Sequence, residues 1–222
     1  MRLIKLTRRV SAMAAVLAGG MALAGSQPLI TDFGPGVGGP IPDNNTIGFI
    51  TPIIIEDSFA ITGVEVILHG LQHNYSSDLT ITLTHSGVST PITLVTNLRN
   101  GSGADFDGDY TFSDSGANLW QVAEGIGGTN DIPPGAYQAS GTGGTTTSLN
   151  AKYAGEDARG AWILRIADTS FLVSGSIQGW SLRLLPGATP PPPPCPGDVN
   201  GDNVVDGADL SVLLANFGNV CR

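Results

Sequence analysis

The sequence predicts an all-β fold for most of its 222 residues, and three features carry that prediction. Apolar and polar residues alternate with a period of two along several short runs between residues 41 and 185. Turn-rich segments such as NGSGADFDGD and SGTGGTTTS separate these runs. The composition, rich in Gly, Thr and Ser and poor in Lys, is typical of β-rich extracellular proteins. We therefore expect antiparallel sheets that share one sandwich or barrel core.

The first 24 residues predict a secretory signal peptide. An apolar run from Val10 to Ala24 follows four basic residues, Arg2, Lys5, Arg8 and Arg9, and is too short for a comfortable membrane span. Small residues, Ala22 and Ala24, occupy the positions that a signal peptidase reads. The alternative is an uncleaved membrane anchor. We expect a secreted or cell-surface protein, without membrane insertion after signal removal, exported by the general secretory or the twin-arginine route.

The net charge of the chain indicates which kinds of partner it can bind. Removing the signal leaves six Lys and Arg residues against nineteen Asp and Glu residues, a net charge of −13. A chain this acidic repels phosphate backbones, so nucleic acid is not an expected partner. The same charge favours binding of calcium.

The strands are expected between residues 40 and 185, after a loose Gly- and Pro-rich lead-in over residues 25 to 39. The clearest strand is LTITLTH, in which the aliphatic residues face the core and the threonines face outward: Leu79, Ile81 and Leu83 against Thr80, Thr82 and Thr84. Further inward-facing sets are Val64, Val66 and Leu68; Ile92 and Leu94; Trp162, Leu164 and Ile166; and Trp180, Leu182 and Leu184. No segment in this region shows helical periodicity.

A Pro-rich linker over residues 186 to 194 predicts a domain boundary. Five consecutive prolines, Pro190 to Pro194, favour polyproline II and form a stiff spacer. Residues 195 to 222 are therefore expected to form a separate and much smaller unit. Cys195 and Cys221 bracket that unit, and a secreted compartment lets them form a disulfide worth roughly 3–4 kcal/mol on the chain-entropy model.

The small unit opens with the spacing of a calcium-binding loop. Counted from Asp198 as position 1, oxygen-bearing side chains stand at positions 3, 5, 9 and 12, and position 7 offers a backbone carbonyl: Asn200, Asp202, Asp206, Asp209 and Val204. An apolar stripe follows at i, i+3, i+4 and i+7: Leu210, Leu213, Leu214 and Phe217. Gly218 predicts the end of that helix.

The large segment resembles the P domain of subtilisin-like proprotein convertases. The quoted motifs are IPDNN at residues 41 to 45, VEVILHGLQHNYSSDLTITLTH, and YAGEDARGAWILRIADTSFLVSGSIQGWSLRL, in the order of the family. The resemblance implies a jelly-roll-like β-sandwich of about eight strands. It also implies that His73, Tyr75 and Asp78 lie at the turn between two antiparallel core strands.

The small unit resembles one repeat of type I dockerins, which are calcium-loop and helix modules that bind cohesins. Asn at position 3 and Asp at position 12 carry this resemblance. Dockerins have two such repeats and this chain has one, so the helix stripe needs another cover. The expected cover is a cohesin-like receptor, a second copy of the chain or the sandwich.

No catalytic residue is predicted. The protease domain of the convertases is absent, and the sequence contains neither a His-x-x-x-His zinc motif nor a Gly-x-Ser-x-Gly elbow. Asp105, Asp107 and Asp109 alternate in one loop and bind calcium if the loop curls; the alternative is an acidic loop held by Asx turns.

We therefore expect a secreted, non-catalytic binding or assembly protein with a calcium-dependent docking tail. Two alternatives stay open. The sandwich binds carbohydrate or another surface polymer, or it acts as an accessory P domain that stabilises a separate subtilisin-like protease.

Overall fold

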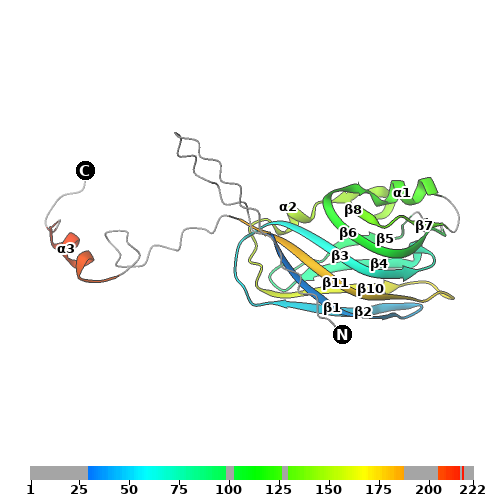
Figure 1. Ribbon diagram of the computed structural model, residues 1–222, viewed down its shortest axis with the longest axis horizontal. Coiled ribbons are helices and arrows are strands. Elements are labelled where there is room, and N and C mark those ends of the chain that lie inside the picture. The colour runs from blue at the N-terminus through cyan, green and yellow to red at the C-terminus, as the bar shows by residue number, and fades with distance from the viewer. Residues whose placement is uncertain (1–29, 99–102, 127–129, 188–204, 216, 218–222) are drawn as a thin grey trace, which may run out of the picture.

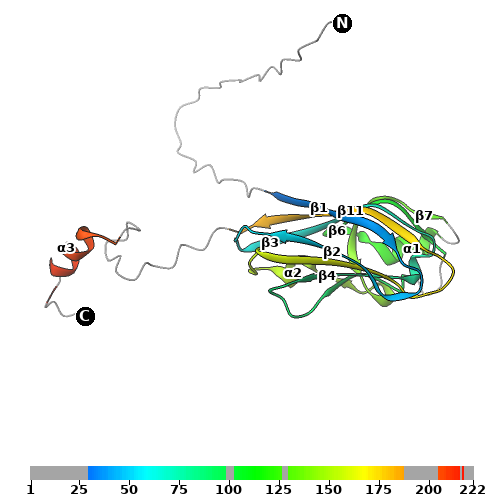
Figure 2. The ribbon, with the colours of Figure 1, turned by 90° about the horizontal axis from the view of Figure 1, so that it is seen from below.

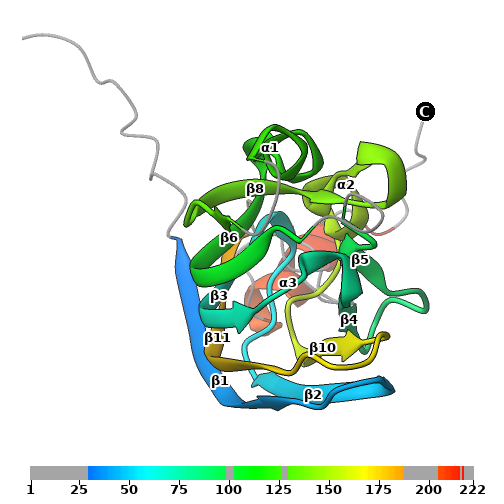
Figure 3. The ribbon, with the colours of Figure 1, turned by 90° about the vertical axis from the view of Figure 1, so that its right-hand side faces the viewer.

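The computed structural model describes residues 30–98, 103–126, 130–187, 205–215 and 217. In these residues eleven strands form one hydrogen-bonded sheet, whose path runs β1-β11-β3-β6-β8-β5-β4-β10-β2. The sheet curls until β1 and β2, its two edge strands, lie beside each other (Figures 1 and 3). The result is two facing layers joined through β8, which confirms the predicted all-β sandwich and makes it nearly closed.

One layer contains β1 (Thr31–Ile41), β11 (Gly175–Pro186), β3 (Ile61–His73), β6 (Asp105–Asn118) and the short β7 (Asp131–Ile132). The other contains β2 (Asn45–Ile55), β10 (Gly160–Asp168), β4 (Leu79–His85), β5 (Ile92–Thr96) and the short β9 (Thr146–Thr147). Strand β8 (Gly135–Ser140) pairs with β6 of the first layer and with β5 of the second. These two pairings and that of β6 with β7 are parallel, whereas the other strand pairs are antiparallel.

The core lies between the layers and uses the inward sets that the alternation predicts. Strand β4 alternates buried and half-buried residues along its whole length, with the aliphatic residues inside and the threonines outside. Trp162 and Trp180 are the largest fully buried side chains. The ring of His85 lies 4.4 Å from that of Trp162, centroid to centroid. The predicted register of β4 is therefore confirmed, and both tryptophans are core residues.

Residues 31 to 39 are a strand and not the loose lead-in that their composition predicts. They belong to β1, which pairs with β11 from Thr31 opposite Leu184 to Ile41 opposite Gly175. Their glycines let the backbone of β1 pass close to β11, its neighbouring strand in the same layer. A Cβ on Gly36 would lie 2.3 Å from Nε1 of Trp180, and one on Gly38 would lie 2.1 Å from a backbone oxygen of Gln178. The glycines here are a packing requirement of a strand, and the sandwich starts at Thr31.

The turn that contains Tyr75 and Asp78 joins two core strands, β3 and β4, as predicted. The two strands do not pair with each other, because β3 lies in one layer and β4 in the other. The turn between them, a 3-10 helix η1 (Ser76–Asp78), is a crossover between layers. Helices also occur where no helical periodicity was found: α1 (Leu119–Ile126), the five-residue α2 (Leu149–Tyr153) and the 3-10 helix η2 (Thr142–Gly144). The five residues of α2 are too few to show a period. Helix α1 does carry an apolar stripe at i, i+3, i+4 and i+7, namely Leu119, Val122, Ala123 and Ile126, and that signal was missed.

The remaining helix, α3 (Gly207–Ala215), belongs to the C-terminal unit. It begins directly after Asp206, and its first turn includes Asp209, the last residue assigned to the calcium loop. Figure 2 shows α3 as a helix near the C-terminal end of the chain. None of the helices among the described residues is both long enough and apolar enough to cross a membrane.

Candidate functional site

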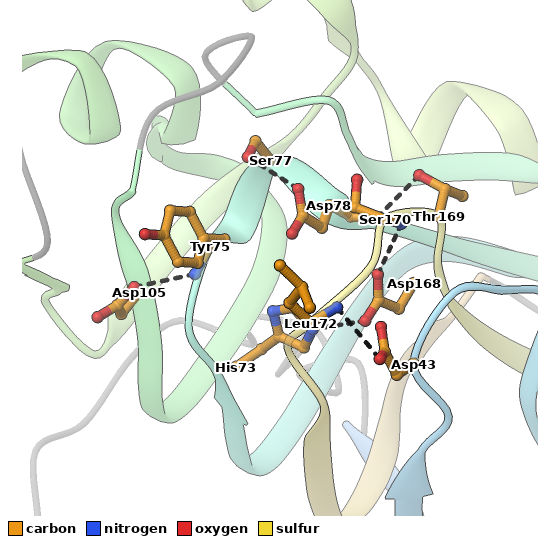
Figure 4. A network of polar contacts seen from close by, with 10 residues as sticks. All are labelled: Asp43, His73, Tyr75, Ser77, Asp78, Asp105, Asp168, Thr169, Ser170 and Leu172. Atoms are coloured by element: carbon orange, nitrogen blue, oxygen red, sulfur yellow. Dashed lines mark hydrogen bonds and ion pairs between the residues drawn. The ribbon is translucent and has the colours of Figure 1, made fainter.

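The loops at one end of the sandwich converge on a buried pair of polar side chains. His73 ends β3 in one layer, and Asp168 ends β10 in the other. Nε2 of His73 lies 3.1 Å from Oδ2 of Asp168, and both side chains are completely buried. The two residues come from the two sequence motifs that support the P-domain resemblance, and they lie 95 positions apart. The pair therefore joins the two layers at this end (Figure 4).

The same carboxylate organises the loop that follows β10. Oδ1 of Asp168 accepts a hydrogen bond of 3.0 Å from the backbone N–H of Ser170. Next to it, the N–H and the hydroxyl of Thr169 both donate to the backbone oxygen of Asp78, at 2.9 and 3.1 Å. The loop after β10 is thus tied to the turn after β3, which is the turn that the sequence singled out.

Two large residues at this end adopt a backbone conformation that L-residues rarely use. Tyr75 has φ of 74° and Leu172 has φ of 88°. A carboxylate holds each of them: Oδ1 of Asp105 accepts from the N–H of Tyr75 at 2.9 Å, and Oδ2 of Asp43 accepts from the N–H of Leu172 at 3.2 Å. Such strained positions persist only where surrounding contacts enforce them. The acidic residues of this end thus act mainly as loop anchors.

A polar pocket of about 430 Å³ opens beside these loops. Its lining is rich in amide, hydroxyl and carboxylate groups: Gln72, His73, Asn74, Phe106, Asp107, Asp131, Ser174, Gly175 and Ser176. Part of the lining is a row across three strands, in which Ser176 of β11 lies opposite Gln72 of β3, and Gln72 lies opposite Asp107 of β6. Nε2 of Gln72 donates to Oδ1 of Asp107 at 3.0 Å. With two carboxylates and no Lys or Arg in its lining, the pocket suits a neutral or cationic polar ligand.

The three aspartates predicted for a second calcium site lie on strand β6 and not on a curled loop. Each accepts a hydrogen bond from a different donor: Asp105 from the N–H of Tyr75, Asp107 from Gln72, and Asp109 from the N–H of Gly70 at 2.7 Å. An extended strand spaces alternate residues about 6.7 Å apart, so it spreads such a set instead of gathering it. In the described part of the chain, no three His, Cys, Asp or Glu side chains are arranged to hold a metal. Calcium binding by this set stays a prediction.

The buried histidine lacks the neighbour that nucleophilic catalysis requires. A base activates a Ser, Thr or Cys that lies within hydrogen-bond distance of its free nitrogen. Nδ1 of His73 is buried and has no hydrogen-bond partner among the described residues. The other buried histidine, His85, stacks on Trp162, and its Nε2 lies 3.2 Å from the backbone oxygen of Arg159. Among the described residues, His73 thus contacts Asp168, and His85 packs on Trp162.

The C-terminal site lies only partly within the described residues. Asp198, Asn200, Asp202 and Val204 lie outside them, as do Cys195 and Cys221. Asp206 and Asp209 are described, and they form a reciprocal cap at the start of α3. Oδ1 of Asp206 accepts from the N–H of Ala208 at 2.7 Å, and Oδ2 of Asp209 accepts from the N–H of Asp206 at 2.8 Å. This is a capping box, in which two side chains satisfy N–H groups at the helix start.

The capping box was not predicted, although an Asp-x-x-Asp spacing before an apolar run is its sequence signal. The oxygen ligands that Ca²⁺ prefers are the kind that these two residues supply, so the described end of the loop fits the ion. The apolar stripe after the cap is exposed: Leu210, Leu213, Leu214 and Phe217.

Comparison with known proteins gives little further information. No protein-family model matches this chain, and no curated protein matches it. Among solved structures, the serine protease of Aeromonas sobria in complex with the chaperone ORF2 aligns at 15% identity and a TM-score of 0.41 over 73% of this chain and 28% of that chain. The structure of the Aeromonas sobria serine protease aligns at 18% identity and a TM-score of 0.38 over 74% and 28%. This chain thus spans 28% of the length of the solved chains, and the likeness is too weak to assign a function.

Proposed function

We propose that this chain is a secreted, non-catalytic binding and assembly protein, in which the β-sandwich is a rigid body and the C-terminal unit attaches it to a protein partner. The observation that carries the proposal is the exposed stripe of α3. Leu214, near the end of α3, is 63% exposed, and Phe217, two residues beyond the helix, is 85% exposed. Asp206 and Asp209 cap the N-terminal end of the same helix. A helix of nine residues with an uncovered apolar face gains its stability from packing, and a partner supplies that packing.

Calcium is the proposed cofactor of this unit. Asp206 and Asp209 would contribute carboxylate oxygens, together with Asp198, Asn200 and Asp202 of the predicted loop. The ion would neutralise carboxylates that otherwise repel one another at the helix start. Binding of the ion and ordering of the unit would therefore be coupled, which makes docking dependent on calcium.

The absence of catalysis follows from the same proposal. Within the described residues, His73 pairs with Asp168 and has no nucleophile at its second nitrogen. We expect no hydrolysis of unstructured casein and no labelling by serine-directed fluorophosphonates. Stoichiometric labelling of any one serine would overturn this part of the proposal.

The experiment that tests the docking proposal is a calcium-dependent pull-down with three full-length proteins. Wild-type chain should capture a defined secreted receptor with calcium and release it with EGTA. Leu214→Asp should abolish capture while calorimetry shows nearly unchanged calcium binding, because the ligands precede the stripe. Ser211→Asp, which adds the same charge to the same helix outside the stripe, should capture like the wild type. Equal capture by all three proteins would contradict the docking role of α3.

A second candidate function rests on the polar pocket at the end of the sandwich. Its amides, hydroxyls and carboxylates are groups that hydrogen-bond the hydroxyls of a carbohydrate, and Asn74, Asp131 and Ser174 come from three different segments. Retention of the wild-type chain on insoluble polysaccharide, and its loss in Asp131→Ala, would support this function.

The third candidate, an accessory role for a separate protease, predicts that the chain raises the melting temperature of a co-expressed subtilisin-like protease.

A further inference from the structure

The polar pocket at the end of the sandwich carries acceptor groups that the fold does not use. Asp43 and Asp105 each accept a hydrogen bond from the backbone N–H of a loop residue. Asp131, by contrast, is exposed in the pocket lining and accepts no hydrogen bond from any of the described residues. Of the two oxygens of Asp107, only Oδ1 accepts a hydrogen bond from the described chain, and its donor is Gln72. Both oxygens of Asp131 and one of Asp107 are therefore available to a ligand.

A buried nitrogen adds a further acceptor to the same lining. His73 lines the pocket but is only 2% exposed, and its Nε2 lies 3.1 Å from Oδ2 of Asp168. An ionised carboxylate only accepts hydrogen bonds, so Nε2 carries the hydrogen and Nδ1 of the neutral ring is an acceptor. Nδ1 lies on the side of the ring turned away from Asp168 (Figure 4) and has no partner among the described residues. A buried polar atom without a partner costs stability, and a ligand that donates a hydrogen bond to it would remove that cost.

The strand register brings carboxylates of like charge close together at this pocket. In the parallel pair of β6 and β7, Asp105 lies opposite Asp131, and Asp107 follows two residues further along β6. The spacing of neighbouring strands places the Cα atoms of Asp107 and Asp131 about 8 Å apart. Like charges opposite each other destabilise a sheet, and no Lys or Arg stands among the described residues of the lining. A bound cation would remove this repulsion.

The geometry of the pocket favours a guanidinium over a metal ion or a sugar. In the described part of the chain, no three His, Cys, Asp or Glu side chains are arranged to hold a metal, and a volume of about 430 Å³ is far larger than one ion. The one aromatic ring of the described lining, Phe106, is 1% exposed and offers no ring face to a sugar. A guanidinium is planar and always charged, and it carries five N–H donors and no acceptor. It therefore matches a lining of separated carboxylates and an acceptor nitrogen.

An exposed apolar pair on the loop after β10 indicates that the ligand belongs to a protein. Phe171 is 72% exposed and Leu172 is 93% exposed, and the same loop continues into Ser174 of the pocket lining. The backbone of Leu172 is held at φ of 88° by its hydrogen bond to Asp43. Strained positions of this kind are concentrated at binding and active sites. An apolar anchor next to a site for arginine is a combination typical of protein interfaces.

We propose that this pocket binds an arginine side chain of a protein partner. Asp107 and Asp131 pair with the guanidinium, and Phe171 and Leu172 pack on the residues next to that arginine. The acidic surface attracts a partner that is basic at this point, which favours encounter in the right orientation. The proposal goes beyond docking through the tail, because α3 contributes no residue to the described lining. It also assigns the pocket a ligand other than carbohydrate.

Calorimetry on the full mature chain tests the proposal, with EGTA present to keep calcium out of the titration. The probes are the blocked peptide acetyl-Leu-Arg-Leu-amide and its citrulline and lysine analogues. The arginine peptide should bind at least about tenfold more tightly than the citrulline peptide, which has nearly the same shape but no charge. The lysine peptide should bind more weakly than the arginine peptide, because an ammonium lacks the planar fork. Equal affinity of the arginine peptide and either analogue, or no binding up to about 10 mM, would overturn the proposal.

Variants of the lining locate the binding site. Asp131→Asn removes one charge and no hydrogen bond of the described chain, so it should fold like the wild type and weaken the arginine peptide at least about tenfold. Asp107→Asn should have the same effect, and its amide oxygen still accepts from Gln72. Glu124→Gln is the matched control, because Glu124 is exposed on α1 and lies outside the pocket lining. It should leave the affinity within about twofold of the wild type.

The remaining outcomes separate this site from the other functions. Equal losses in Asp131→Asn and Glu124→Gln would show an effect of net charge alone and overturn the proposal. Leu214→Asp should bind the arginine peptide like the wild type, and loss of binding in that variant would assign the peptide to α3. Retention on a neutral polysaccharide that is lost in Asp131→Asn, without binding of the arginine peptide, would assign the pocket to carbohydrate and overturn the proposal.

Discussion

Nε2 of His73 and Oδ2 of Asp168 lie 3.1 Å apart in the interior of the molecule, and each side chain comes from a different layer of the sandwich. No solvent reaches either group, so the interaction is not weakened by water as a surface ion pair is. The pair also fixes the loop after β10 through the N–H of Ser170. It therefore links the packing of the core to the shape of the pocket end.

The first prediction concerns this pair. Asp168→Ala leaves a buried imidazole without its partner, so we expect the free energy of unfolding to fall by about 3–5 kcal/mol. Urea unfolding followed by tryptophan fluorescence measures the loss. The matched control is Asp32→Ala. Asp32 pairs with Arg183 at the surface, and the Asp32 side chain is 64% exposed. That change should cost less than about 1 kcal/mol. Equal losses for the two variants would contradict a special role for the buried pair.

The second prediction concerns alkaline stability. The Tyr110 hydroxyl donates to the backbone oxygen of Ile132 at 2.7 Å and accepts from the N–H of Asp107 at 3.0 Å. Burial raises the pKa of Tyr110 from 10.0 to about 12. Because the folded-state pKa lies above the unfolded value, the protonated phenol stabilises the fold fully below pH 10. That contribution is lost as the pH rises through 12.

Tyr110→Phe should therefore have two effects. At pH 7 the free energy of unfolding should fall by about 1–2 kcal/mol, because the buried hydrogen bonds of the hydroxyl are lost. Between pH 10 and 12 the remaining stability should decline less steeply than in the wild type. Urea unfolding at several pH values measures both effects. If the free energy of unfolding falls with pH equally steeply in the two proteins, the ionisation of Tyr110 is not coupled to unfolding.

The third prediction concerns the glycine-rich first strand. Gly36→Ala places a methyl group against the ring of Trp180, which is fully buried and cannot swing away. We expect a loss of about 2–3 kcal/mol from overpacking, measured by thermal and urea unfolding. Gly125→Ala is the control, because a Cβ at that position in α1 meets no atom within 4 Å. It should be neutral or raise stability by up to about 1 kcal/mol.

These cases show which features of the fold are local in sequence. The alternation of β4 is predicted from its own seven residues, because a strand with one face on a core needs no knowledge of its partner. Strand β1 has no such pattern. Its conformation depends on Trp180 and on the backbone of Gln178, which lie about 140 positions away. A Gly- and Pro-rich segment is therefore predicted to be a loop as long as its partner strand is unknown.

The candidate site also combines residues that the local sequence identifies with a contact that it does not predict. The sequence motifs contain both His73 and Asp168, but nothing local indicates that these two residues pair across the layers. The short helix α2 depends on Asp114 in the same way. Both carboxylate oxygens of Asp114 accept hydrogen bonds at the helix start, from Ser148 at 2.6 Å and from the N–H of Leu149 at 2.7 Å. A five-residue helix held by a side chain 34 positions away has no periodicity of its own to detect.

The last prediction concerns the start of α3. Asp209 caps the helix through the N–H of Asp206 and occupies position 12 of the proposed calcium loop. Without calcium, Asp209→Ala should reduce the helical signal in circular dichroism, because the cap is lost. With calcium, calorimetry should show affinity reduced by at least about tenfold, because position 12 supplies a main carboxylate ligand. Glu56→Ala removes one exposed carboxylate from the sandwich and should change neither signal. If Asp209→Ala binds calcium like the wild type, this residue is a helix cap alone, and the ion is held by other residues.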